Sequence, residues 1–173
     1  MGETKAIRAI TVTSSDTRTT ADDTGGARLR ELLGEAGWTL GDHHIVREDP
    51  AELRGKLTEL GARDDVDVIV TTGGTGLGPR DNTVEIVSAL VDREMLGFGE
   101  AFRRRSWDQI GPRSMLSNAT AGTLGAKLVF ALPGSPKALE LAVRELIVPI
   151  AGHALAVASG KARHADAHGS KGA

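Results

Sequence analysis

The sequence predicts a single α/β domain with an open, mostly parallel sheet and helices on both faces. Strand signals and helix signals alternate along nearly the whole chain, which is typical of parallel strands joined by crossover helices. Two glycine-rich turns directly follow apolar strands, at the place where such sheets bind ligands. The 173 residues suffice for one core, and no linker rich in proline, glycine or serine divides the chain.

The first half of the chain sets out this alternation. The β-rich segment 7–12 predicts the first strand, and an amphipathic helix with a leucine stripe follows and ends near Gly37. A short strand is expected around Ile45. The next helix begins at 49–52 with a carboxylate cap, a proline and a glutamate at capping-box spacing. The apolar run 66–72 predicts a central strand that is covered on both faces.

The second half continues in the same way. Helices are expected over 83–91, with Asn82 as the cap and Glu85 completing a capping box, and over 97–109. The last clear strand is 127–132. A proline-glycine turn leads from this strand into a final helix with a continuous apolar face.

The composition excludes several classes of function. A net charge of -2 and an aromatic content of 3% argue against nucleic acid or an anionic membrane as partner. Without cysteine there is no disulfide or cysteine nucleophile, as is typical of a reducing compartment. Residues 1–8 lack an apolar signal core, so a cytoplasmic location is expected. Residues 1–158 are expected to form the domain, and the low-complexity tail 159–173 to be disordered.

The segment 72–81 is the most informative stretch of the chain. Its four glycines within 73–78 let the backbone approach an anion, so successive N–H groups can cradle phosphate oxygens. A helix that begins near Thr83 would add the positive end of its dipole. The segment fails the dinucleotide fingerprint, whose last glycine is Pro79 here, and it fails the P-loop pattern. It therefore predicts another kind of phosphate cradle, with a tight turn without ligand as the alternative.

Two aspartates are candidate ligands of a cation. Asp81 ends the glycine-rich loop, where a carboxylate beside bound phosphates is tolerated if Mg²⁺ lies between them. Its alternative role is a second cap of the helix that follows. Asp49 is explained by its capping box, although a function beyond the cap stays open.

Polar residues at two further strand ends are candidate ligand contacts. Ser15 and Asp16 follow the first strand, and Thr24 opens the next helix; they line a pocket or they serve as cap and turn residues. Ser135 in the turn 132–136 caps the final helix, with or without a contact to ligand. This turn is no nucleophile elbow, because a lysine replaces the second glycine.

The ordered set of motifs resembles that of a known family. The motifs are Ser15-Asp16, Thr72-Gly73-Gly74-Thr75-Gly76 with Asp81, Asp92-Arg93-Glu94, Gly97-Phe98-Gly99-Glu100, Phe102-Arg103, Leu116-Ser117 and Leu132-Pro133-Gly134-Ser135-Pro136. They are similar to those of the MoaB/MogA family of molybdenum cofactor biosynthesis, to which the G domain of gephyrin also belongs. The resemblance covers about Ile7 to Ala151 in unbroken order, and the whole set is far more specific than any single motif.

The resemblance implies a three-layer α/β/α molybdopterin-binding fold, usually assembled as a trimer and sometimes as a hexamer. It implies a molybdopterin adenylyltransferase, in which the terminal phosphate of molybdopterin attacks the α-phosphate of ATP with Mg²⁺ as cofactor. The products would be adenylyl-molybdopterin and pyrophosphate, and a molybdenum-insertion protein would act downstream. Such a transfer requires positioning and charge neutralisation rather than a covalent nucleophile, and the sequence offers no obvious activated nucleophile.

The resemblance also implies roles for individual residues. Asp81 is expected to take part in the Mg²⁺-dependent transfer, and Asp49 to contribute, so both are expected metal ligands. The nucleotide phosphates are expected on Thr72, Gly73, Gly74, Thr75 and Gly76. The pterin side is expected on Gly97, Phe98, Gly99, Glu100, Pro133, Gly134 and Ser135. Further binding residues are expected at Ser15, Asp16, Thr24 and Ser117.

One position departs from the family pattern. Asn118 stands where an arginine often follows Leu-Ser, which weakens one contact to an anion. The family also includes members that keep the fold without the activity. A non-catalytic molybdopterin-binding or carrier protein is therefore the alternative, and the failed fingerprint disfavours a nicotinamide oxidoreductase.

Overall fold

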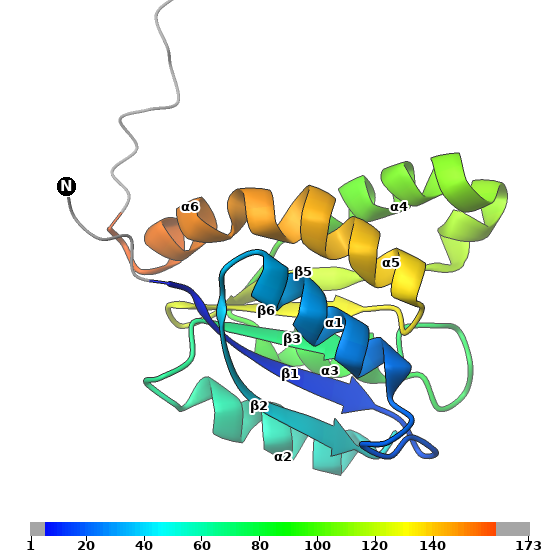
Figure 1. The fold of residues 1–173 in the computed structure, drawn as a ribbon, viewed down its shortest axis with the longest axis horizontal. Helices are drawn as coiled ribbons and strands as arrows, with labels where there is room; N and C mark the ends of the chain where they lie inside the picture. Colours follow the sequence, from blue (N-terminus) through cyan, green and yellow to red (C-terminus); the bar gives the residue numbers. More distant parts are fainter. Residues whose placement is uncertain (1–5, 162–173) are drawn as a thin grey trace, which may run out of the picture.

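A six-stranded sheet lies between two layers of helices in the computed structural model, which describes residues 6–161 (Figure 1). The strands are β1 (Arg8–Ser14), β2 (Thr39–Val46), β3 (Val68–Thr72), β4 (Arg93–Glu94), β5 (Thr120–Leu124) and β6 (Lys127–Leu132). The helices are α1 (Thr24–Glu35), α2 (Pro50–Gly61), α3 (Thr83–Leu90), α4 (Leu96–Ile110), α5 (Pro136–Leu141) and α6 (Val148–Ala158), with a 3₁₀ segment η1 (Gly111–Leu116) and a π segment η2 (Ala142–Ile147).

The strand order across the sheet is β2-β1-β3-β6-β5-β4. β1 pairs in parallel with β2 and β3, and β3 pairs in parallel with β6. β5 is antiparallel to both β6 and β4. The predicted three-layer α/β/α fold with a mostly parallel open sheet is confirmed, and the parallel strands bring their carboxyl ends to one edge.

Each face of the sheet has its own apolar core, because successive side chains of a strand point to opposite faces. Val68 and Val70 of β3 pack in the core that α1, α4, α5 and η2 cover. Ile69, between them, belongs to the core under α2 and α3. The two helical layers lie on opposite sides of the sheet in Figure 1. Cover on both faces explains why β3 is buried along its whole length.

The run α5-η2-α6 forms one continuous helical stretch over Pro136–Ala158. Pro149 has no N–H to donate to the carbonyl of Glu145, and the turn before it widens into the π segment. By length and composition this is the one helix of the described chain that could cross a membrane. Leu139, Val143 and Ile147 are fully buried against the sheet, so one face of this helix packs on the core.

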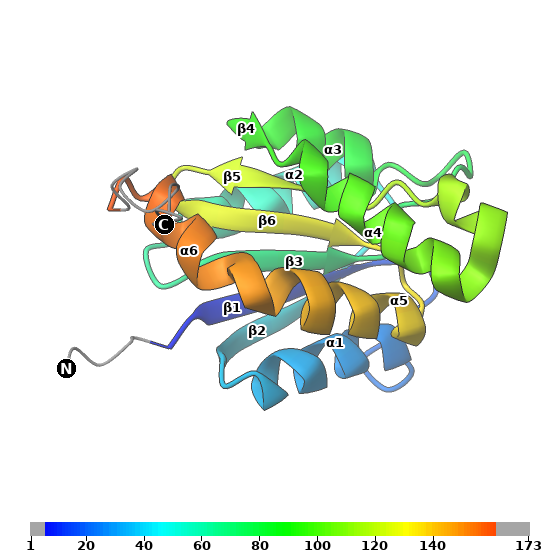
Figure 2. The same ribbon diagram turned by 90° about the horizontal axis from the view of Figure 1, so that it is seen from above.

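The two ends of the sheet differ in what they carry. Figure 2 shows the arrowheads of β1, β3 and β6 directed toward the edge where the turn into α5 lies. The beginning of β1 and the end of α6 lie at the opposite edge. The glycine-rich loop after β3 and the turn after β6 are therefore neighbours, as predicted, at the carboxyl edge of the sheet.

Some elements differ from the sequence prediction. β2 is a full strand of eight residues rather than a short one around Ile45. β4 and β5 were not predicted, because β4 consists of two exposed charged residues and β5 contains a glycine and threonines. Gly122 in β5 is required, since a Cβ there would come within 2.6 Å of the carbonyl oxygen of Arg93.

The predicted cap of α3 is only partly confirmed. Asn82 occupies the N-cap position but makes no side-chain cap hydrogen bond, and the capping box with Glu85 does not form. The backbone N–H of Thr83 instead donates to the carbonyl of Gly74 at 3.0 Å. Of the predicted tail, only 159–161 fall within the described residues, where Ser159 ends α6. The prediction of a disordered tail otherwise lies outside them.

Candidate functional site

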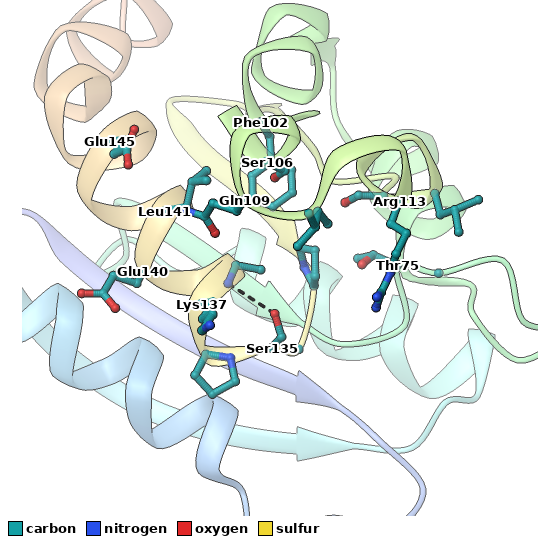
Figure 3. Close-up of a pocket in the computed structure, with 18 of the residues that line it drawn as sticks. Thr75, Phe102, Ser106, Gln109, Arg113, Ser135, Lys137, Glu140, Leu141 and Glu145 are labelled. Atoms are coloured by element: carbon teal, nitrogen blue, oxygen red, sulfur yellow. Dashed lines mark hydrogen bonds between the residues drawn. The ribbon is translucent and has the colours of Figure 1, made fainter. Parts of the chain in front are cut away.

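A cavity of about 1190 Å³ lies at the carboxyl edge of the sheet (Figure 3). Its walls come from the glycine-rich loop, the turn after β6, the carboxyl half of α4 with η1, and the first turns of the α5 run. The lining residues that the sequence predicted are Gly74, Thr75, Gly76, Asp81, Ser117, Pro133, Gly134 and Ser135. The two motifs thus form one site, although about 60 residues separate them in the sequence.

The glycine-rich loop is held tightly against its neighbours. Gly73 and Gly74 have φ angles of 91° and 65°, which side chains rarely adopt. A Cβ on Gly73 would lie 2.5 Å from the carbonyl oxygen of Ser14 at the end of β1. The N–H of Gly73 donates to the carbonyl of Leu132 at 3.0 Å, so the backbone ties the loop to the turn after β6. Both glycines are therefore structurally necessary here.

The turn after β6 is fixed from two sides. The hydroxyl of Thr72 donates to the carbonyl of Pro133 at 3.1 Å. The Oγ of Ser135 accepts the N–H of Ala138 at 3.3 Å, drawn as a dashed line in Figure 3, and so caps α5. Ser135 is exposed and lines the cavity. The cap role of Ser135 is confirmed, and its hydroxyl is also available to a ligand.

Asp81 faces the cavity and shapes the loop that precedes it. Its Oδ2 accepts the N–H of Gly78 at 2.7 Å, and a Cβ on Gly76 would lie 2.7 Å from the same oxygen. Asp81 does not cap α3, so the alternative of a second cap is wrong. Asn118 donates from Nδ2 to the carbonyl of Gly76 at 3.3 Å, which links the segment after η1 to the loop.

Beside the cavity, three carboxylates and one arginine form an acidic corner: Asp16, Glu48, Asp81 and Arg80. Arg80 forms an ion pair with Asp16, and its Nε lies 3.8 Å from Oε2 of Glu48. The backbone N–H of Glu48 donates to Asp16 at 3.1 Å. The pKa of Glu48 is raised, mainly by burial and then by the negative charges of Asp16 and Asp81. The positive charge of Arg80 offsets part of this rise. Negative charge is thus concentrated next to the predicted phosphate cradle.

Asp49 does not belong to this corner. Its Oδ1 accepts the N–H of Glu52 at 2.9 Å as the N-cap of α2, and its side chain lines no part of the cavity. The neighbouring Glu48 is the residue that joins the corner, through its backbone N–H to Asp16 and its Oε2, 3.8 Å from Nε of Arg80. The sequence analysis missed Glu48, because a cap motif identifies the residue at the helix start and not the one before it.

The acidic corner offers carboxylate oxygens, the ligands that Mg²⁺ prefers. Among residues 6–161, no three His, Cys, Asp or Glu side chains come together closely enough to hold a metal ion by themselves. Mg²⁺ commonly needs only one or two carboxylates, with water and substrate phosphates as its other ligands. Asp81 on the cavity wall, with Glu48 and Asp16 nearby, fits that requirement.

Several predicted binding residues lie away from the cavity. Gly97, Phe98, Gly99 and Glu100 form the first turn of α4, where the ring of Phe98 lies 5.1 Å from that of Phe130 in the core. Thr24 is exposed at the start of α1. The Oγ of Ser15 accepts the N–H groups of Thr17 and Arg18 at 3.2 Å, which makes it a turn residue. The structure does not bring these residues to the site within one chain.

The structure adds a wall that the sequence analysis did not assign to the site. Phe102, Ser106, Gln109 and Arg113 project into the cavity from α4 and η1, opposite Ser135 (Figure 3). Phe102, Ser106 and Gln109 recur every three to four residues, as on one helix face, which is the signal that could have found them. Arg113 follows the end of α4 at Ile110 and lies in η1.

The cavity contains cations suited to an anionic ligand. Lys137 and Arg113 line it, and in the described part of the chain neither forms an ion pair. Arg144, also on the wall, is held by Glu35 at 2.8 Å. Glu140 and Glu145 also line the cavity, and apolar side chains such as Phe102 and Leu141 complete the wall. A ligand with a flat apolar body and a phosphate end fits this chemistry.

Comparisons with known proteins identify the family. The family model described as a probable molybdopterin binding domain matches residues 9–153. The chain belongs to this family. The MoaB/MogA resemblance drawn from the motifs is therefore confirmed, and the chain is a molybdenum cofactor biosynthesis protein.

Relatives within the MoaB/MogA family share most of the chain. Molybdenum cofactor biosynthesis protein B of Bacillus anthracis is 47% identical over 150 residues, covering 86% of this chain and 89% of the relative. A crystal structure of molybdenum cofactor biosynthesis protein B has 45% identity and a TM-score of 0.86, over 89% of this chain and 96% of that one. The crystal structure of the tungsten cofactor synthesizing protein MoaB from Pyrococcus furiosus has 34% identity and a TM-score of 0.80, and the match covers 90% of this chain and 98% of that one.

Proposed function

We propose that this protein adenylylates molybdopterin, using ATP and Mg²⁺ and releasing pyrophosphate. The observation that carries the proposal is the joining of the glycine-rich loop, Asp81 and the turn after β6 in one cavity. The loop offers backbone N–H groups to phosphates, and α3 begins behind it with its positive dipole end. The opposite wall offers apolar surface and hydrogen-bonding groups to a pterin.

The residues of the site suit a direct transfer between two phosphates. Backbone amides of Thr75 and Gly76 would hold the nucleotide phosphates, and Lys137 and Arg113 would neutralise charge on the pterin side. When Mg²⁺ is bound it screens the repulsion between the two phosphorylated substrates, and Asp81 with Glu48 would hold it. The cavity wall contains no activated serine, and the chain has no cysteine, so the pterin phosphate itself would be the nucleophile.

Replacement of Asp81 by asparagine tests this proposal. Asparagine keeps the shape and the acceptor for the N–H of Gly78, but it removes the charge. We expect pyrophosphate release from molybdopterin and MgATP to fall by about 100-fold or more. The reason is that Asp81 would no longer hold the Mg²⁺ that compensates negative charge in the transition state. The measurement is a coupled pyrophosphate assay at saturating substrates.

Asp92→Asn is the matched control for that variant. The Oδ2 of Asp92 also accepts one backbone N–H at 2.7 Å, from Gly125, but it lies outside the cavity. Its turnover should stay near that of the wild type. Undiminished pyrophosphate release in Asp81→Asn would remove Asp81 from the reaction.

A non-catalytic molybdopterin carrier is the second candidate. The feature that favours it is Asn118, a neutral residue whose amide is engaged with the carbonyl of Gly76 rather than free to bind an anion. A carrier would bind molybdopterin and release no pyrophosphate from MgATP. The wild-type assay alone therefore separates the two candidates.

A further inference from the structure

A buried polar network lies under the first turn of α1, outside the cavity. Asp23 is 6% exposed, and its Oδ2 accepts the hydroxyl of Thr13 at 2.6 Å. The Nε2 of His43 lies 2.9 Å from the same oxygen, and Nδ1 of His43 lies 2.8 Å from the hydroxyl of Thr11. The Oδ1 of Asp23 accepts the N–H of Gly26 at 2.8 Å as the N-cap of α1. Capping of α1 requires only this last hydrogen bond, so the contacts of Asp23 with Thr13 and His43 go beyond the cap.

The carboxylate of Asp23 can only accept, so Nε2 of His43 donates to it. The hydroxyl of Thr11 lies between Nδ1 of His43 and the guanidinium of Arg30, which is 3.4 Å away. Burial by itself would raise the pKa of Asp23, but the bonds from Thr13, Gly26 and His43 outweigh it and lower that pKa. The carboxylate is therefore held as an anion with every oxygen engaged.

This network adjoins the ligand turn through α1. Gly25 is the residue between Thr24 and the capped amide of Gly26, and a Cβ on it would lie 2.9 Å from the carbonyl oxygen of Gly134. Gly134 and the neighbouring Ser135 line the cavity. A shift of the first turn of α1 therefore moves the cavity wall, because nothing separates the two backbones.

We propose that His43 is a positioning residue for the cavity: through Asp23 it fixes the first turn of α1 against Gly134 and so sets the place of the Ser135 turn. His43 lies on β2 and lines no part of the cavity. This inference rests on the proposed function only in its choice of molybdopterin as the ligand.

The experiment compares two replacements of His43. His43→Leu removes both ring nitrogens, whereas the amide of His43→Gln can still donate to Asp23. We expect the affinity for molybdopterin to fall about ten-fold in the leucine variant, because small displacements of binding groups are costly. The glutamine variant should recover most of that loss. Gly25→Ala, which pushes directly on Gly134, should reproduce the loss with His43 intact.

Two controls separate positioning from stability. His44 is the next residue of β2, and its Nε2 has no hydrogen-bond partner within the described structure. The variant His44→Leu should therefore bind molybdopterin with the affinity of the wild type. Leu60→Ala destabilises the core on the other face of the sheet. If Leu60→Ala loses as much affinity as His43→Leu, or if His43→Leu keeps wild-type affinity, the positioning role is overturned.

Hydrogen exchange gives a readout that needs no ligand. The N–H groups of Ala138 and Leu139 are bonded to Ser135. They should exchange several-fold faster in His43→Leu, with unchanged rates in His44→Leu. Equal rates in both variants would overturn the inference. If the wild type binds no molybdopterin, the proposed function fails while this exchange result still decides the role of His43.

Discussion

Glu48 lies beside the like charges of Asp16 and Asp81, with only Arg80 opposing them. A carboxyl group whose pKa is raised in the folded state binds its proton more tightly when the chain is folded. Its ionised form therefore favours unfolding, and stability falls as the pH rises from its ordinary pKa of 4.5 through the folded value. The ionised carboxylate of Glu48 thus lowers the stability of the folded protein at neutral pH.

Glu48→Gln should make the protein more stable than the wild type at pH 7. The advantage should disappear below about pH 4.5, where Glu48 is protonated in both states. Urea unfolding as a function of pH measures the difference in the free energy of unfolding. Glu59→Gln is the opposite control, because the hydrogen bond from Lys56 lowers the pKa of Glu59, and this variant should lose stability at pH 7. A lower stability of Glu48→Gln at pH 7 would contradict the prediction.

Neighbouring residues show what the sequence could and could not reveal at this scale. The cap role of Asp49 was predictable, because proline and glutamate follow it at fixed spacing. That Glu48 rather than Asp49 turns toward Asp16 depends on the direction of the chain as it enters α2. Pattern spacing contains no information about this direction.

At the scale of elements, the glycine-rich loop depends on backbone shape at Gly73. This residue has a φ of 91°, and a Cβ on it would lie 2.5 Å from the carbonyl oxygen of Ser14, so any side chain must move β1 or the loop. The carbonyl of Gly74 in this loop also accepts the N–H of Thr83, and this hydrogen bond orients α3 behind the loop.

Gly73→Ala should therefore lower the free energy of unfolding by roughly 1–3 kcal/mol, from backbone strain together with the collision. Gly125→Ala is the matched control, because Gly125 has a φ of 57° but its Cβ would meet nothing within 4 Å. Its cost should be about 1 kcal/mol, from strain alone. Equal costs for both variants in urea unfolding would show that the contact with Ser14 has no influence.

The elements that the sequence predicted share a strong pattern. β1, β3 and β6 are runs of buried residues, and each is followed by a distinct turn. β4 and β5 lacked such a pattern, because β4 is the edge strand and pairs only with β5, while β5 depends on pairing with β6. Edge strands are specified by their neighbours more than by their own residues.

At the scale of the whole molecule, exposed apolar side chains gather on α4 and η1. Trp107, Ile110 and Met115 are 49%, 48% and 65% exposed in the single chain. Surfaces of this kind are commonly covered by another protein chain. A trimer, as the family resemblance implies, stays a prediction for this protein, and these residues are its candidate contacts.

Light scattering of the full chain should give a mass near three times 18.1 kDa. Met115→Glu should shift the mass toward that of the monomer, because a charge would be buried in the contact. Val157→Glu, at an exposed apolar position of α6, should leave the mass unchanged. A wild-type mass of 18.1 kDa at micromolar concentration would contradict the trimer.

Half of the cavity was predictable from the sequence. The loop after β3 and the turn after β6 were placed together correctly, because parallel strands end at one edge. The other wall depends on how α4 crosses the sheet: helical spacing groups Phe102, Ser106 and Gln109 on one face but does not show that this face meets the cavity. The Gly97–Glu100 segment shows the converse, since this family motif lies away from the cavity, with Phe98 and Gly99 buried and its two ends exposed.

The beginning of β1 and the end of α6 share the edge of the sheet that lies away from the cavity (Figure 2). An affinity tag or a fused protein attached before β1 or after α6 would start on the side remote from ligand entry. Immobilisation through either end should therefore leave the binding face open to solution, which suits surface-based affinity measurements with the variants described above.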